Sequence, residues 1–160
     1  MSIISTDHFT VRLLAACPPS DPPSTAERAA CGAAVDEVLA RSVAPVVEPP
    51  LAALPDAFAL LVATGGTASV LGLMELDTAE FDRARLDGIE LARAAVERHG
   101  DRLWSLSLAQ RRQVPGLPPE RADVILMGVA IYAAVMEQFK LPVLRVSLRG
   151  VRAGALLAEA

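Results

Sequence analysis

Apolar positions along the first part of the chain occur in short runs that proline-rich segments separate. Apolar residues in 9–14 predict a first strand or a strand-to-helix corner, and the proline-rich stretch 17–23 must then be a loop. Ser24 and Glu27 have the spacing of a capping box, and apolar residues recur at helical spacing behind them. The pattern therefore predicts a helix over 24–41.

After a second proline-rich passage, 44–55, the pattern changes from strand to helix. The run 58–63 is short and continuously apolar, which predicts a strand buried on both faces, as in the centre of a parallel sheet. Helical spacing resumes over 68–74, and a further helix has its core at Glu90–Gly100. There His99 is placed to favour the helix C-terminus.

The last third of the chain predicts one enclosed helix, one strand and one terminal helix. Pro118 and Pro119 open the longest helix, in which 124–136 carries no charge and must be nearly enclosed against a sheet. A strand follows at 143–146, and 150–157 predicts a terminal helix. Strands that alternate with helices indicate an α/β fold, and a length of 160 residues predicts a single domain over 1–160.

Composition and charge narrow the function classes. The 15 Lys plus Arg against 19 Asp plus Glu give a formal net charge of −4, which argues against general binding of a nucleic-acid backbone. No apolar run reaches the length of a membrane span, and the first residues lack the pattern of a secretory leader, so we expect a cytoplasmic protein. Cys17 and Cys31 are too few for a disulfide framework, and we expect both to be small buried side chains.

The segment Thr64-Gly65-Gly66-Thr67 lies between the predicted buried strand and a helix. Glycine lets backbone N–H groups approach an anion, and the helix N-terminus adds partial positive charge, so this loop can bind phosphate. A tight strand-to-helix turn needs glycine even where nothing binds. Ser147 and Gly150 close a second strand-to-helix turn, a further ligand edge because α/β sheets bind ligands at the carboxyl ends of their strands.

Three motifs follow the glycine loop in a fixed order: 111–117 (RRQVPGL), 121–128 (RADVILMG) and 147–154 (SLRGVRAG). Together with 5–14 and the helix start at Ser24, they resemble the C-terminal half of the exopolyphosphatase/guanosine pentaphosphate phosphatase (Ppx/GppA) family. This resemblance covers essentially the whole chain. It implies a single lobe of an actin-like, ribonuclease H-like ATPase-type fold.

The resemblance also implies a function and a gap in the catalytic machinery. It implies phosphate binding at Thr64, Gly65, Gly66 and Thr67, Mg²⁺ as the cofactor, and polyphosphate or a guanine nucleotide as the phosphate-bearing partner. The family's first lobe carries the glutamate that activates water and a further phosphate motif, neither of which is present here. Ala153 stands where an acidic residue is usual. No catalytic residue and no metal ligand is therefore assigned in this chain.

Several other side chains are expected to be structural. Arg121 and Asp123 can reach a phosphate or a metal, but an ion pair or a cap at the start of the apolar helix is the expected role. Trp104 and Tyr132 can stack on a base, but isolated aromatic residues in an apolar chain usually lie in the core. Gly128 is expected to permit close helix packing.

Two main hypotheses of function follow, with a third beside them. The first is a hydrolase that removes terminal phosphates and works only when a separate first-lobe protein completes the cleft. The second is a non-catalytic module that binds phosphate or a nucleotide, or assembles as a homo-oligomer through the surface that would face the missing lobe. A lobe of an actin-like sugar or acetate kinase shares the glycine loop but not the motifs at 111–123.

Overall fold

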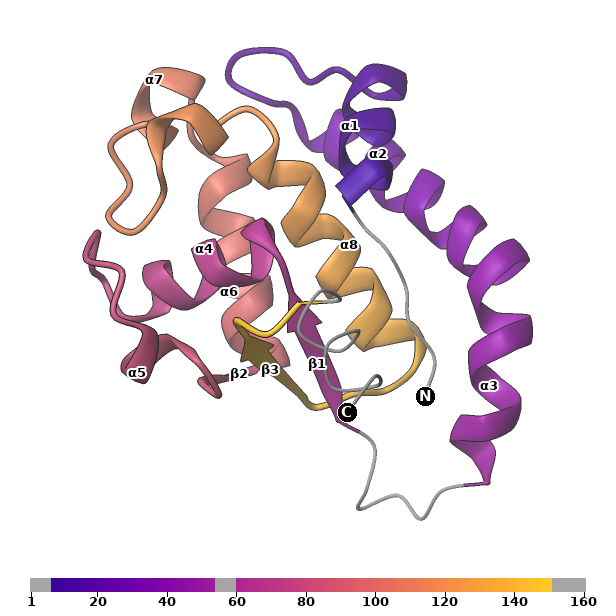
Figure 1. Ribbon diagram of the computed structural model, residues 1–160. Coiled ribbons are helices and arrows are strands. Elements are labelled where there is room, and N and C mark those ends of the chain that lie inside the picture. Colours follow the sequence, from indigo (N-terminus) through magenta and orange to yellow (C-terminus); the bar gives the residue numbers. More distant parts are fainter. Residues whose placement is uncertain (1–6, 54–59, 151–160) are drawn as a thin grey trace.

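The protein is built around one long helix with a small sheet on one side of it. The computed structural model describes residues 7–53 and 60–150. A three-stranded sheet lies against α8 (Ile125–Gln138), with α4 (Gly66–Glu75) and α6 (Arg93–Trp104) on one flank, and α1 (Asp7–Ala16) and α2 (Thr25–Val38) on the other (Figure 1). The arrangement is mixed α/β, as the alternation of strands and helices predicted.

The first apolar segment lies wholly within a helix, so the prediction of a strand or a strand-to-helix corner over 9–14 is wrong. A strand would place Phe9, Val11 and Leu13 on one face. In α1, Leu13 is 3% exposed, whereas Val11 is 61% exposed, because a helical period separates residues that are two apart. The buried side of α1 packs against α8.

The predicted capping box starts α2, and the helix then continues further than expected. The Glu27 amide donates to Ser24 Oγ, and the Ser24 amide donates to Glu27 Oε2. Hydrogen bonds from the Ser24 backbone and the Ser20 hydroxyl lower the pKa of Glu27 to about 2. Beyond α2 the chain forms a π-helical turn, η1 (Leu39–Val43), and then α3 (Ala44–Ala52), which tolerates Pro45 because that residue lies in the first turn.

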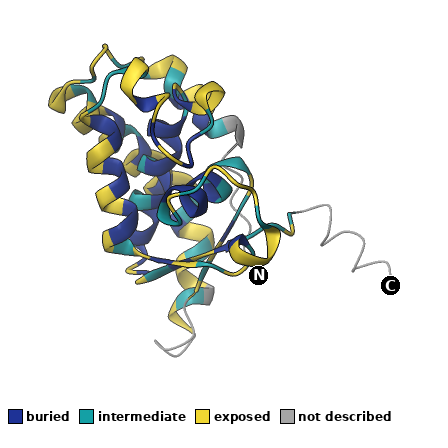
Figure 2. Ribbon diagram, turned by 90° about the vertical axis from the view of Figure 1, so that its left-hand side faces the viewer, coloured by how far each residue is buried: buried dark blue, intermediate teal, exposed yellow. Residues whose placement is uncertain are grey.

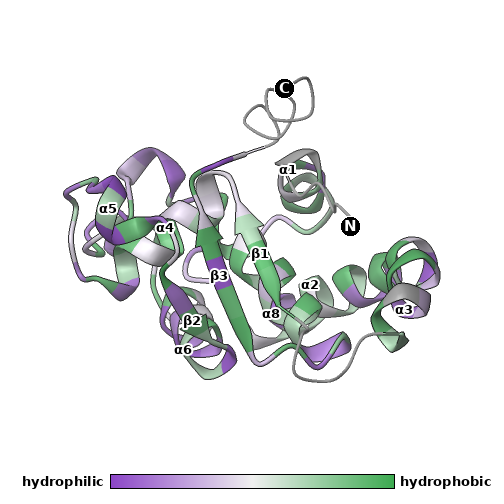
Figure 3. Ribbon diagram, turned by 60° about the horizontal axis from the view of Figure 1, so that its bottom comes forward, coloured by the Kyte–Doolittle hydropathy of each residue, from purple (hydrophilic) through white to green (hydrophobic). Residues whose placement is uncertain are grey.

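The sheet has the order β1-β3-β2 and one exposed face. β1 (Leu61–Thr64) runs parallel to β3 (Val143–Ser147), and β2 (Glu90–Ala92) pairs antiparallel with β3. β3 confirms the strand expected at 143–146. Figure 3 shows β1 and β3 side by side with α8 behind them.

The expectation that 58–63 forms a central strand buried on both faces is wrong for the described residues. Residues 54–59 lie outside them, and β1 is at the edge of the sheet. Val62 is 51% exposed while Ala63 is buried, because the described helices cover only one face of the sheet. An apolar strand of this kind leaves a surface that another chain segment can cover.

The helix predicted at 68–74 is confirmed as α4, but the one predicted at Glu90–Gly100 is wrong at both ends. Residues 90–92 form β2, in which buried Leu91 alternates with exposed neighbours. α6 then runs to Trp104, so His99 lies within the helix and not at its end. The apolar residues at the start of this segment therefore follow a strand period of two before the helical period begins.

Short helices connect the remaining elements. They are α5 (Arg83–Leu86), α7 (Leu108–Arg111) and the 3₁₀-helix η3 (Pro119–Arg121). The prolines expected to open the longest helix open η3 instead, and α8 begins after it. The predicted terminal helix at 150–157 lies outside the described residues apart from Gly150.

The core surrounds α8, as its uncharged sequence predicted. Nine of the helix residues are buried, and they join buried side chains of α1, α2, α4, α6 and β3 in one cluster. In Figure 2 the helices are buried on their inner sides and exposed on their outer sides. Trp104 and Tyr132 are each 6% exposed, in agreement with the core role expected for them. Among the described helices, none combines the length and apolarity needed to cross a membrane.

The two cysteines differ in burial. Cys31 is fully buried, with its Sγ 3.4 Å from Met127 Sδ, whereas Cys17 is half-buried. Burial raises the pKa of the Cys31 thiol to about 11. Cys31 is therefore a small core side chain, as expected, whereas the same expectation is wrong for the half-buried Cys17.

Candidate phosphate-binding site

The glycine loop lies where β1 turns into α4. Gly65 caps the helix with φ 91° and ψ −173°, a conformation that favours glycine. The Gly65 carbonyl accepts hydrogen bonds from the backbone N–H and the hydroxyl of Ser69. None of the described side chains caps the helix N-terminus, so the first amide groups of α4 can donate to an anion.

The guanidinium of Arg121 lies directly over this loop. A Cβ atom placed on Gly66 would meet Arg121 Nη1 at 2.7 Å and its Cζ at 3.0 Å. Arg121 belongs to η3 and is exposed, and none of the described carboxylates forms an ion pair with it. The ion pair expected for Arg121 is therefore not formed with any described carboxylate. Asp123 accepts from the adjacent Val124 amide at 2.8 Å, but no side-chain hydrogen bond caps the start of α8, so the expected cap is wrong.

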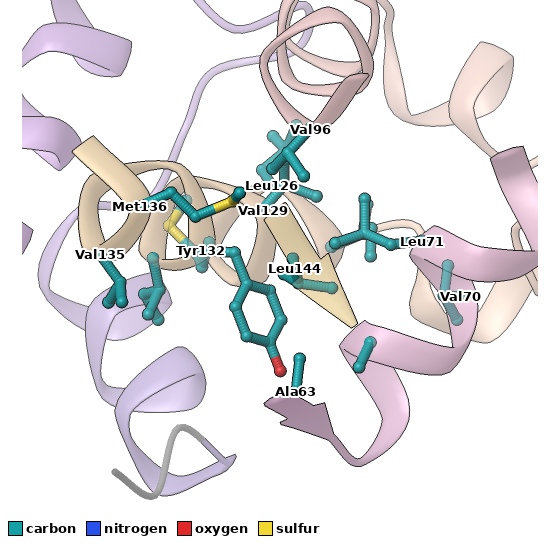
Figure 4. Close-up of a cluster of buried hydrophobic side chains, with 14 of the residues drawn as sticks. Ala63, Val70, Leu71, Val96, Leu126, Val129, Tyr132, Val135, Met136 and Leu144 are labelled. Carbon is teal, nitrogen blue, oxygen red and sulfur yellow. The ribbon is translucent and has the colours of Figure 1, made fainter. Parts of the chain in front are cut away.

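Two residues of α8 hold the loop from its inner side. A Cβ on Gly128 would lie 2.5 Å from Thr67 Cγ2 and 2.6 Å from Thr67 Oγ1, so the absence of a side chain at Gly128 makes room for Thr67. The Tyr132 hydroxyl donates to the Thr64 carbonyl at 3.3 Å, and Figure 4 shows it directed toward β1 near Ala63. The close packing expected at Gly128 is thus confirmed, against the loop itself.

The predicted turn at Ser147 and Gly150 lies at the same end of the sheet as the glycine loop. Thr64 and Ser147 are partners in the parallel register, so the carboxyl ends of β1 and β3 meet there. Ser147 Oγ accepts from the Arg149 amide at 3.2 Å, which engages it in its own turn. Gly150 ends the described part of the chain beyond this turn.

A shallow depression of about 260 Å³ lies next to the loop and does not include it. Its lining residues come from the outer face of the sheet and the turns beside it: Val62, Asp87, Gly88, Arg145, Val146, Ser147 and Arg149. Arg145 donates to Glu90 from both Nε and Nη2, and Arg149 Nε lies 3.6 Å from Asp87 Oδ2. Because both guanidinium groups are paired, the depression lacks the free positive charge that Arg121 brings to the loop.

The partly buried carboxylate of Glu75 has structural partners. Although burial raises it, the pKa of Glu75 is lowered overall by the hydrogen bond with His99 and the charge of Arg98. His99 Nε2 and Arg98 Nη2 lie 2.7 and 2.8 Å from Glu75 Oε2. The histidine expected at a helix end therefore joins α6 to α4.

The described residues do not fit a Mg²⁺ site. Mg²⁺ is held by carboxylates together with phosphate oxygens and water. Within 7–53 and 60–150 there is no group of three or more His, Cys, Asp and Glu side chains that could hold a metal. The donors at the glycine loop are amides and a guanidinium, which suit an anion.

The model of the Ppx/GppA phosphatase family matches residues 1–160. The chain belongs to this family. Comparison with curated proteins gives no significant match.

Solved structures with the same fold are about twice as long. The Ppx/GppA phosphatase of Aquifex aeolicus is 23% identical with a TM-score of 0.76, and the alignment covers 94% of this chain and 46% of that one. An exopolyphosphatase from Cytophaga hutchinsonii is 18% identical, with a TM-score of 0.70 and coverages of 94% and 46%. An exopolyphosphatase-like protein is 20% identical, with a TM-score of 0.80 and coverages of 94% and 48%.

The chain thus spans about half the length of these structures. Its fold is one lobe of the actin-like fold that the Ppx/GppA enzymes share. The predicted α/β class and the predicted family are both confirmed.

Proposed function

We propose that the chain is the phosphate-holding half of an exopolyphosphatase-type hydrolase. In this proposal Thr64, Gly65, Gly66 and Thr67 bind a terminal phosphate of polyphosphate or of guanosine pentaphosphate, and Ser147 and Gly150 border the ligand. Cleavage requires a second half that this chain does not supply. The cytoplasmic location expected from the sequence stays a prediction.

The observation that carries this proposal is the position of the Arg121 guanidinium over Gly66, where it forms an ion pair with none of the described carboxylates. The amides at the start of α4 donate to phosphate oxygens, and the helix dipole contributes about 0.3 to 1 kcal/mol at an exposed site. Arg121 adds charge-assisted hydrogen bonds from the opposite side. A tight turn alone would need Gly65, but it would not need a guanidinium beside Gly66.

Hydrolysis needs more than this half-site provides. Phosphoryl transfer requires an in-line nucleophile, neutralisation of developing charge and a group that orients water. The family's water-activating glutamate is expected in the family's first lobe, and Mg²⁺, which we expect only by family, lacks a ligand set among the described residues. The proposal therefore assigns binding to this chain and catalysis to the completed protein.

Removing the Arg121 charge is expected to weaken anion binding at least about tenfold, because a hydrogen bond to a charged group is worth about 1.5–3 kcal/mol. The measurement is calorimetric titration of the purified chain with tripolyphosphate at low salt, comparing wild type with Arg121→Ala. Arg112→Ala is the matched control, because Arg112 is also exposed and lies earlier on the same segment. Equal affinities for wild type and Arg121→Ala would contradict the proposal, as would an equal loss in the Arg112 variant.

The chain alone is expected to release no phosphate from polyphosphate, because it lacks the glutamate that would activate water. The measurement is phosphate release with Mg²⁺ present, and the control is a full-length family enzyme under the same conditions. Turnover in the ordinary enzyme range of about 1 to 10³ s⁻¹ would show that this half is catalytically sufficient.

Among the described strands, β1 lies at the edge of the sheet, which favours a second candidate function, that of an assembly module. Leu60 and Val62 are 40% and 51% exposed, and the segment 60–64 carries no charge or proline to protect the edge. Such an edge pairs readily with another strand. In this alternative, a second copy of the chain covers the surface that the other half covers in a complete protein.

Light scattering is therefore expected to give a mass above that of the monomer at tens of micromolar, and Val62→Lys is expected to shift it toward the monomer. Lysine on an edge strand opposes pairing because its charge must stay in water. Val11→Lys is the matched control, since Val11 is 61% exposed on α1. A monomer mass for the wild type, or the same shift for both variants, would argue against assembly through β1.

A further inference from the structure

We propose that residues 111–122 form a strap along α4 that positions Arg121 over the glycine loop, with Arg111 and Gly116 as its anchors. The strap begins at the end of α7, passes the last turn of α4 and ends beside the first turn of that helix. The proposal rests on the proposed function, because it explains how the phosphate-binding half keeps its cation in place.

Gly116 fixes the strap to the far end of α4. Its φ is +79°, and a Cβ there would lie 2.5 Å from the Leu73 carbonyl carbon and 2.6 Å from the Met74 nitrogen. The two backbones therefore touch without an intervening side chain. Val114 and Leu117, on either side of Gly116, are 6% and 4% exposed, so the strap is also held by buried apolar side chains.

Arg111 joins the two ends of the strap. Its side chain is 3% exposed, Nε donates to the Ala122 carbonyl at 2.9 Å, and Nη1 donates to the Leu106 carbonyl at 2.6 Å. Burial lowers the pKa of Arg111, and the charges of Asp21 and Asp123 oppose that shift. Ala122 follows Arg121 directly, so these hydrogen bonds fix the backbone from which the Arg121 side chain extends.

This geometry separates the roles of the two arginines. Arg111 is enclosed and its donors face backbone carbonyls, so it is a positioning residue. Arg121 is exposed at Gly66 and is the group that would touch an anion. A long side chain loses rotamer entropy when it is ordered on a ligand. Because the backbone at Arg121 is fixed, the Arg121 side chain has fewer conformations to lose when an anion binds.

The first test of the strap needs no phosphate. In the labelled full chain, nuclear Overhauser effects between the Arg121 side chain and the Gly66 α-protons are expected in the wild type and lost in Arg111→Met. Methionine keeps an apolar stem but removes both hydrogen bonds. Arg111→Lys keeps the charge and a donor, so it is expected to retain part of the signal, and it replaces the methionine variant if that protein does not fold.

The second test is titration with inorganic phosphate. Arg111→Met is expected to weaken phosphate binding about tenfold, the loss also expected for Arg121→Ala. The double variant is expected to bind no more weakly than either single variant, because both changes remove the same interaction, that of Arg121 with the anion.

Retention of the Arg121–Gly66 signal in a folded Arg111→Met protein would overturn the strap, and so would multiplicative losses in the double variant. Failure of the wild type to bind phosphate while the signal depends on Arg111 would instead overturn the proposed function and leave the strap standing. The strap and the proposed phosphate binding can therefore be contradicted independently of each other.

Discussion

Replacing Gly116 with alanine is expected to lower the free energy of unfolding by about 3 kcal/mol or more. Two effects act together. A left-handed backbone costs a residue with a Cβ about 1–2 kcal/mol, and the new Cβ would lie 2.5 Å from backbone atoms of Leu73 in α4. Backbone cannot move aside as the tip of a side chain can, so overpacking adds about 1–3 kcal/mol.

Two other glycines separate these effects. Gly88 has φ +92° and no atom within 4 Å of a built Cβ, so Gly88→Ala carries the conformational cost alone. Gly32 lies within α2, also in open space, and Gly32→Ala is expected to stabilise the protein by about 0.5–1 kcal/mol.

Denaturant unfolding of the three variants gives the measurement. The expected order of stability is Gly32→Ala, wild type, Gly88→Ala, Gly116→Ala. A Gly116 variant no less stable than the Gly88 variant would mean that the strap does not lie against the backbone of α4 as described.

Local sequence signals predict those elements whose conformation depends on interactions between residues close together in the chain. The capping box at Ser24 and Glu27 marks the start of α2 because both partners lie within one turn. Segment 9–14 was mispredicted because its apolar residues fit both periods, and only the contact of α1 with α8 favours the helix. The same ambiguity hid β2 at the start of what was read as one helix.

The site could be predicted only in part for a related reason. Glycines between a strand and a helix identify the loop at 64–67 locally. Its supports come from positions more than fifty residues away: Arg121 over Gly66, Gly128 against Thr67 and Tyr132 on the Thr64 carbonyl. Spacing along the chain cannot show such contacts. The motifs at 111–117 and 121–128 carry the family resemblance, and in the structure both contact α4 and its loop.

Replacing Gly66 with valine is expected to abolish measurable phosphate binding while the fold stays intact. Gly66 is the first residue of α4, and the atoms that a Cβ would meet are the tip of the flexible Arg121 side chain. That tip can move away, so we expect a stability change within about 1 kcal/mol. In the proposed site, the valine side chain would then occupy the position of the anion and displace the Arg121 guanidinium that would bind it.

The expected affinity of the wild type sets the range of the experiment. A few hydrogen bonds and one guanidinium must offset the entropy of binding, so we expect a dissociation constant near millimolar, about −4.1 kcal/mol. If Gly66→Val lowers the affinity more than tenfold, its dissociation constant lies above the tens of millimolar phosphate used in the titration. Gly32→Ala, far from the loop in sequence and expected to be stable, serves as the control for unchanged binding.

Amide NMR during titration with inorganic phosphate tests the central claim most directly, because it reports where the anion binds. The account predicts saturable shifts at Gly65, Gly66 and Thr67 in the wild type and in Gly32→Ala, and none at these positions in Gly66→Val. Absence of shifts in the wild type at tens of millimolar phosphate, or equal shifts in the valine variant, would contradict it and leave the loop a tight turn between β1 and α4.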